Sequence, residues 1–355
     1  MGWIPSANNK GSRIGYACLA VLLLLPVSGL SQETDHGFGY QSLAVNNPSV
    51  AGVEEYGTFR LSYINHYPGQ NYNFHSVYFS YDSYFQSVHG GASVFLTNDY
   101  LGGIVNDLRG GVAYSYHLQA GRELYINAGL SASFFHRGFN FSDALFPDQI
   151  DLMGSASLPT SENLSDQNRT IFDVGSGFML MYRNYSGGLA ITHLAQPDLN
   201  NDGEPVERLK RKYFFHIKGD FELGKRSGME IEPLLFAAVQ GDYFGAGAGA
   251  SAGNQVVAAN VLLMLKNSGN TDIQAGFSFR KENLAFFYNY RFNLLSGNSL
   301  LPFSLAHQTG LTYRLNKVEK RLKYGTIKNC HLYSYTWCPK KHFWKYCILT
   351  NHKCD

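Results

Sequence analysis

The chain has 355 residues, and only 16% of them are charged, against roughly 25% in ordinary soluble domains. Phe, Tyr and Trp make up 15% of the residues, glycine numbers 37, and the mean hydropathy is −0.19. The low charge argues against an ordinary soluble domain, and the hydropathy argues against a bundle of membrane-spanning helices. Many aromatic residues and glycines without long apolar runs are typical of a β-rich protein in an unusual solvent.

The N-terminus has the pattern of a cleaved signal peptide. Lys10 and Arg13 precede the apolar run LAVLLLLPV (19–27), and Gly29 and Ser31 supply small residues for cleavage. The apolar run is about half of the ~20 residues that a membrane-spanning helix needs, which leaves an uncleaved anchor helix as the alternative. We therefore expect a signal peptide at 1–31 and an N-terminal periplasmic segment at 32–56.

Stretches of alternating polarity recur along the rest of the chain. In ELYINAGLSASFF (123–135), Leu124, Ile126 and Leu130 fall on one face and Asn127 and Ser131 on the other, because successive strand side chains point to opposite sides. Most such stretches are near the length of a tilted membrane strand, which is about 9–11 residues. The candidate strands are 58–67, 71–81, 88–98, 107–117, 123–135, 170–182, 185–193, 212–223, 229–240, 254–265, 271–280, 283–294 and 306–315.

The stretch 212–223 indicates what lies on each side of the sheet. Tyr213, Phe215 and Ile217 share one face. The other face carries His216, Lys218, Asp220 and Glu222. Three charges on one face fit a water-filled lumen, because an unpaired charge in a packed core costs several kcal/mol. The apolar face then contacts either lipid or a packed protein layer.

The lengths of the connections also favour a membrane barrel. Tight links at 119–123, 183–185, 224–228 and 266–270 alternate with long ones at 137–169, 194–211 and 241–253, although the short link RKEN (280–283) breaks the pattern. Outer-membrane barrels have tight periplasmic turns, long outer loops and, in bacteria, an even number of strands. We expect an all-β fold, a transmembrane antiparallel β-barrel over 57–316, with 14 strands preferred and 12 as the alternative.

Four short elements, in order along the chain, resemble one known family. They are NPSVAG (47–52), FDVGSG (172–177), YSGGLAITHLAQP (185–197) with its H-L-x-x-P ending, and LPFSLAHQTGLTYRLN (301–316). Together they resemble the PorP/SprF family of the type IX secretion and gliding machinery of Bacteroidota. The Gly/Ala-rich stretch GDYFGAGAGASAGN (241–254) and the cysteine-containing tail depart from that family's pattern.

The resemblance implies an outer-membrane protein without enzymatic activity or cofactor. Members of this family support export or cell-surface anchoring of large secreted clients, including adhesins, together with periplasmic ring and lipoprotein components. The partners implied are therefore the outer-membrane bilayer, a secreted client protein and those periplasmic components, with the long outer loops as the docking face.

One loop carries a candidate metal site. In DLNNDGEPVERL (198–209), oxygen ligands alternate as in the opening of an EF-hand calcium loop, with a glycine at the turn. The candidate ligands are Asp198, Asn200, Asp202 and Glu204. The twelfth position, which closes such a loop with a bidentate Glu, is Leu209. An Asx-rich turn in a surface loop is the alternative explanation.

The tail at 317–355 is basic and contains cysteines. It carries nine Lys and Arg residues against two acids, a net +7. Its cysteines are Cys330, Cys338, Cys347 and Cys354. This spacing is not a zinc pattern, and in an oxidising compartment it favours two disulfides of undetermined pairing. The tail is either a docking element for an acidic partner or a segment without a defined partner.

Enzyme signatures are weak. His75 and Ser76 are adjacent on a strand, so their side chains point to opposite faces and a hydrolase pair is not expected. Export to the envelope argues against nucleic acid as a partner of the basic tail. Two other classes remain open beside the secretion barrel: a channel for small or hydrophobic solutes, and a soluble secreted β-protein.

Overall fold

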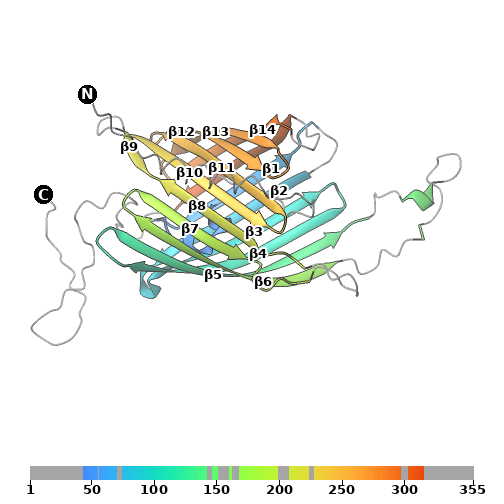
Figure 1. Ribbon diagram of the computed structural model, residues 1–355, viewed down its shortest axis with the longest axis horizontal. Helices are drawn as coiled ribbons and strands as arrows, with labels where there is room; N and C mark the ends of the chain where they lie inside the picture. Colours follow the sequence, from blue (N-terminus) through green and yellow to red (C-terminus); the bar gives the residue numbers. More distant parts are fainter. Residues whose placement is uncertain are drawn as a thin grey trace, which may run out of the picture.

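The computed structural model describes residues 43–54, 56–69, 74–141, 146–150, 160–161, 168–198, 208–223, 228–296 and 303–315. Short helices α2 (Leu43–Asn46), η1 (Pro48–Val50), η2 (Gln86–Val88) and η3 (Pro147–Gln149) accompany one large sheet (Figure 1). The strands are β1 (Thr58–His66), β2 (Phe74–Phe85), β3 (Gly90–Leu101), β4 (Val105–Gln119), β5 (Leu124–Phe139), β6 (Arg169–Tyr182), β7 (Tyr185–Thr192), β8 (Lys212–Gly219), β9 (Phe221–Leu223), β10 (Met229–Gln240), β11 (Tyr243–Gly253), β12 (Val257–Lys266), β13 (Thr271–Lys281), β14 (Leu284–Leu295) and β15 (Ser304–Arg314). In the described part of the chain, no helix is long and apolar enough to cross a membrane.

The sheet closes on itself. With β8 and β9 counted as one strand, each strand pairs antiparallel with the strands before and after it in the chain, and β1 pairs with β15 to complete the ring. Strands β8 and β9 both pair with β10 and form one strand interrupted at Asp220, so the ring has 14 members. Closure leaves no sheet edge whose backbone groups would lack partners in lipid. The prediction of a 14-stranded barrel is confirmed.

The two faces of the sheet have opposite polarity. On β5, Asn127 and Gly129 are buried inside the ring, whereas Leu130 lies outside and is 68% exposed. On β6, Asp173 is buried and its neighbour Phe172 is 77% exposed. A soluble protein buries its apolar side chains, so this reversal identifies the outer wall as the surface that contacts lipid.

The charged face of the 212–223 stretch points into the lumen, as the sequence predicts. His216 is buried inside, and the Lys218 ammonium lies 3.2 Å from carboxylate oxygens of both Asp220 and Glu232. Tyr213 and Phe215 are on the outer wall. Lys218 is therefore paired with both carboxylates, Asp220 on its own side of the strand pair and Glu232 on β10.

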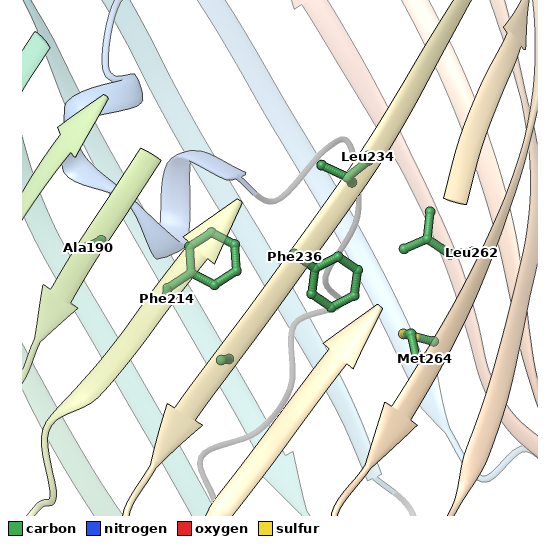
Figure 2. Close-up of a cluster of buried hydrophobic side chains, with 7 residues drawn as sticks. Ala190, Phe214, Leu234, Phe236, Leu262 and Met264 are labelled. Atoms are coloured by element: carbon green, nitrogen blue, oxygen red, sulfur yellow. The ribbon is translucent and has the colours of Figure 1, made fainter. Parts of the chain in front are cut away.

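The lumen also has an apolar wall, which the sequence analysis did not predict. Figure 2 shows side chains from β7, β8, β10 and β12 that form it. They are Ala190, Phe214, Leu234, Phe236, Ala238, Leu262 and Met264, and Leu43 of α2 packs against them. A Cβ on Gly247 would meet Phe236 at 2.4 Å, so glycines on the inner face of β11 leave room for the larger side chains of the neighbouring strands.

The expected long loop at 241–253 is wrong, because these residues form strand β11. The chain turns at Gly241 and Asp242, and Gly241 adopts a positive φ of 59°. Gly/Ala-rich sequence has low strand propensity, but here β10 and β12 supply the side chains that cover it. Because β11 is an additional strand, each later link lies on the opposite end of the barrel from the one expected. The link 266–270 therefore lies on the end with the long loops. The short link RKEN (280–283) lies on the end with the tight turns.

Two long connections remain, β5–β6 and β7–β8, and they leave the same end of the barrel. The opposite end carries tight turns, among them Arg183–Asn184, together with the start of β1 and the end of β15. Leu315 N–H donates to the Gly57 carbonyl there at 2.8 Å. Because tight turns are periplasmic in outer-membrane barrels, this end faces the periplasm.

Candidate functional site

Residues 43–54, which we name the inner segment, lie inside the barrel. This placement differs from the periplasmic segment that the sequence analysis assigned to 32–56. Asn47 is the N-cap of η1, and its Oδ1 accepts hydrogen bonds from Ser49 N–H at 3.0 Å and Ser49 Oγ at 2.6 Å. Both residues are fully buried. An Asn cap followed by Pro at the first position is a strong local signal for a short helical turn.

Three lumenal side chains bind the backbone of the inner segment. Ser115 Oγ on β4 donates to the Ser49 carbonyl at 2.9 Å, and Asn127 Nδ2 on β5 donates to the same oxygen at 3.4 Å. His117 Nε2 on β4 donates to the Ala51 carbonyl at 3.1 Å. Side chains of the barrel wall therefore donate hydrogen bonds to carbonyls of this short turn that have no partner within the helix.

Glycines on the inner wall provide the space for the inner segment. A Cβ on Gly177 of β6 would lie 2.1 Å from Asn47 Oδ1, and one on Gly129 of β5 would lie 2.4 Å from Ser49 N. Gly91 of β3 and Gly188 of β7 are in similar close contact. Any side chain at these positions would displace the segment, so the glycines form a seat whose shape matches the NPSVAG turn.

Charged residues fix the periplasmic end of the inner segment. Gly52 N–H donates to Asp82 Oδ2 at 3.2 Å, and Asp82 is paired with Arg60. Arg60 Nη2 also contacts Glu54 Oε1 at 2.6 Å, and Arg314 Nη2 lies 3.4 Å from Glu54 Oε2. The network connects the inner segment to β1, β2 and β15, the strands at which the barrel closes.

A contact between Asp173 and His193 lies toward the end of the barrel that carries the long loops. Asp173 Oδ2 accepts the backbone N–H of His193 at 3.1 Å and lies 2.9 Å from its Nδ1. His193 follows β7 in a left-handed conformation with φ 58°. This buried pair joins the FDVGSG strand to the H-L-x-x-P element and fixes the first residue of the β7–β8 connection.

The sequence-predicted site residues lie mostly outside the described part of the chain. Asp198 is described, and it bridges to Arg208 across the base of its loop. Asn200, Asp202, Glu204 and the tail cysteines Cys330, Cys338, Cys347 and Cys354 are outside the described residues. Within the described ranges, no group of His, Cys, Asp or Glu has the geometry of a metal site.

His75 faces outward and stacks on Tyr100, while Ser76 is buried in the lumen.

The seat of the inner segment is the feature that sequence reasoning missed. Its signal was present, because inward positions of β5, β6 and β7 are occupied by Gly129, Gly177 and Gly188 where a water-filled lumen needs no glycine. The stretch 47–52 was identified as an element of a family pattern, but nothing local to it indicated that it enters the lumen.

A closed 14-stranded ring with an apolar outer wall, a polar and glycine-lined inner wall and a bound inner segment defines an outer-membrane β-barrel protein. Residues 38–316 match the family model described as Type IX secretion system membrane protein PorP/SprF. The match covers more than half of the chain, so the protein belongs to the PorP/SprF family, and its location is the outer membrane.

Several solved structures are similar to the chain. The outer membrane protein Omp33 of Acinetobacter baumannii has a TM-score of 0.43 at 10% identity, covering 74% of this chain and 99% of that chain. The toluene transporter TodX of Pseudomonas putida has a TM-score of 0.44 at 12% identity, covering 78% and 94%. The CymD monoaromatic hydrocarbon channel has a TM-score of 0.47 at 11% identity, covering 78% and 93%. No match was found among curated protein sequences.

Proposed function

We propose that the protein is a non-enzymatic platform of the type IX secretion system, which supports export or surface anchoring of client proteins such as adhesins. The observation that carries the proposal is the inner segment, which β4 and β5 bind by hydrogen bonds and which fits the glycine seat. A barrel whose interior holds a bound part of its own chain is suited to rigid support rather than to open conduction.

The docking face in this proposal consists of the β5–β6 and β7–β8 connections. Local contacts order parts of both connections. Asp148 accepts the N–H of Ser161 at 2.6 Å, and Arg169 Nη2 donates to the Asp198 carbonyl at 3.1 Å. The Ser161 N–H lowers the pKa of Asp148, so this loop contact is present at neutral pH and weakens as pH falls through that lowered pKa. Periplasmic ring or lipoprotein components would contact the opposite end.

Shortening the two long connections tests the proposal. Residues 151–159 and 199–207 are replaced by short Gly-Ser linkers, which retain the Asp148–Ser161 and Arg169–Asp198 contacts. We expect normal barrel assembly, measured by heat-dependent gel migration, together with loss of surface display of a type IX client. The control inserts the same linker between Gly241 and Asp242, a tight turn on the same end. Undiminished display after both replacements would show that the docking face lies elsewhere.

The apolar lumenal wall favours a second candidate function, a channel for small hydrophobic solutes. Phe214, Phe236 and Leu262 would contact such a solute if the inner segment moved. Uptake of a labelled hydrophobic solute into liposomes separates the two functions. The platform proposal expects no uptake above protein-free liposomes, and the channel requires it.

A further inference from the structure

The apolar lumenal wall is covered on its inner side. Its larger side chains point into the ring (Figure 2) and are between 0% and 4% exposed. They are Phe214, Leu234, Phe236, Leu262 and Met264. Neighbouring strands cover the sides of such a residue, but its tip is covered only by something that lies inside the lumen. The wall therefore has an occupant.

Leu43 accounts for only part of this cover. It is the first residue of the inner segment, and among the described residues it is the hydrophobic side chain that packs against the wall from outside the sheet. The wall extends from β7 to β12, which is four strand spacings or roughly 19 Å. One Leu side chain leaves most of that width to another occupant.

The sequence immediately before Leu43 has a suitable composition. With the expected cleavage after Ser31, 11 residues precede Leu43, QETDHGFGYQS (32–42), and they lie outside the described residues. Their large apolar side chains are Phe38 and Tyr40, and glycines flank Phe38. Aromatic rings bury a large area, and glycine lets the backbone approach a surface closely. The family match begins at residue 38, so the family pattern includes both aromatic residues.

Connectivity favours this segment over other occupants. Phe38 lies five residues before Leu43, and five extended residues span roughly 17 Å, which is most of the width of the wall. Because Leu43 already contacts the wall, the adjoining residues are present there at a high effective concentration and pay little for association. A folded second copy has no access to the interior of a closed ring, and a solute would have to compete with an attached segment.

A buried polar atom beside the wall also fits this segment. His216 is 1% exposed, and its Nδ1 has no hydrogen-bond partner in the described part of the chain. Its ring stacks on Phe214 with ring centres 5.6 Å apart, so this nitrogen lies next to the apolar lumenal wall. Buried polar atoms in folded proteins almost always have a partner. The apolar ring and the hydroxyl group of Tyr40 match the wall and this nitrogen together.

We propose that residues 32–42 bind the apolar lumenal wall from inside the barrel, with Phe38 and Tyr40 against the side chains of β8, β10 and β12. The first residues of the mature protein then lie in the lumen and not in the periplasm. The wall is closed to solutes for as long as the segment is bound. This binding does not depend on the secretion function, because it involves only this chain.

Photocrosslinking in outer-membrane vesicles tests the contact. The photoreactive residue p-benzoylphenylalanine replaces Phe38 in the full chain, and crosslinked peptides are identified by mass spectrometry. We expect products within one chain that join position 38 to peptides of β8, β10 or β12. The same residue at Phe172, on the outer wall, should give none of these products. Products of position 38 with only lipid, another protein or a second copy, or no product at all, overturn the proposal.

Thiol labelling tests whether the segment covers the wall. Met264→Cys is introduced into the full chain, and reaction of position 264 with a small water-soluble methanethiosulfonate is followed by peptide mass spectrometry, which separates it from the tail cysteines. Adding Phe38→Ser and Tyr40→Ser should speed labelling at least tenfold, with the barrel still folded by heat-dependent gel migration.

The matched control adds Glu33→Gln and Thr34→Ala in the same segment and should leave the labelling rate unchanged. Labelling that is equally fast with and without the two aromatic side chains would show that the segment does not cover the wall. Protection that persists after both are removed would identify a different occupant, such as a hydrophobic solute. Either result overturns the proposal.

Discussion

Asn47 Oδ1 lies 2.1 Å from the point that a Cβ on Gly177 would occupy. The two residues belong to separate elements of the family pattern, NPSVAG and FDVGSG, which are far apart in the chain. Their contact gives a physical reason for both, since the Asn caps the turn of the inner segment and the Gly leaves the space in which that cap fits. Asp173 of the same strand contacts His193, so a third element is joined to them.

Gly177→Ala is expected to destabilise the inner segment. The new Cβ would displace the Asn47 side chain and its hydrogen bonds to Ser49, at a cost of about 1–3 kcal/mol typical of overpacking. The urea midpoint, followed by circular dichroism in micelles, measures the change. Gly187→Ala is the matched control, because the nearest atoms to its Cβ lie at 3.5 Å. Adding Asn47→Ala should recover part of the loss, and equal midpoints for the two Gly→Ala variants would contradict the seat.

Arg60→Met is expected to weaken closure of the barrel. Arg60 is largely buried and pairs with Asp82 and Glu54, so its removal leaves a buried carboxylate uncompensated, a loss typically of about 3–5 kcal/mol. Heat-dependent gel migration and urea titration measure it. Arg183→Met, which removes an exposed ion pair with Glu123 in a periplasmic turn, should change little. A similar small effect for both variants would refute the role of Arg60 as the centre of the network.

Asp173→Asn is expected to loosen the start of the β7–β8 connection without unfolding the barrel. The carboxylate accepts the His193 N–H, so faster hydrogen exchange of that amide is the expected result. The Leu194 N–H donates to the Val174 carbonyl and provides an internal reference. Unchanged exchange at His193 relative to Leu194 would show that Asp173 does not order the loop.

Leu130→Arg is expected to impair membrane insertion. Leu130 is 68% exposed on the outer wall, where Arg near the bilayer midplane costs about 2–4 kcal/mol. Folding yield into lipid vesicles is the measurement, and Leu130→Phe, which preserves an apolar side chain, should fold as the wild type does. Equal yields for Leu130→Arg and Leu130→Phe would mean that this wall does not face lipid.

Most of the ring was predictable because every strand except β11 carries its own signal. Leu130 and Asn127 alternate within a few residues of each other, and the lipid requirement extends that alternation over a long strand. The lumenal positions of polar His216 and charged Lys218 were predictable for the same local reason. Phe214, on the same inner face, was not, because the apolar wall that it joins is built from four strands.

Strand β11 and the inner segment could not be predicted locally. Gly247 and Gly249 lack side chains, and the groups that cover them, Phe236 and Leu262, belong to other strands. The inner segment likewise has no hydrophobic period of its own. Its position depends on Ser115, Asn127 and the glycine seat, which come together only when the barrel closes.

Hydrogen–deuterium exchange of the inner segment in native outer-membrane vesicles tests the central claim most directly. The amides of Val50, Ala51 and Gly52 donate to Asn47, Pro48 and Asp82 within the lumen. The account predicts protection of these amides comparable with that of β5 and β6. Exchange at the rate of an unfolded peptide, in vesicles whose barrel strands remain protected, would contradict it.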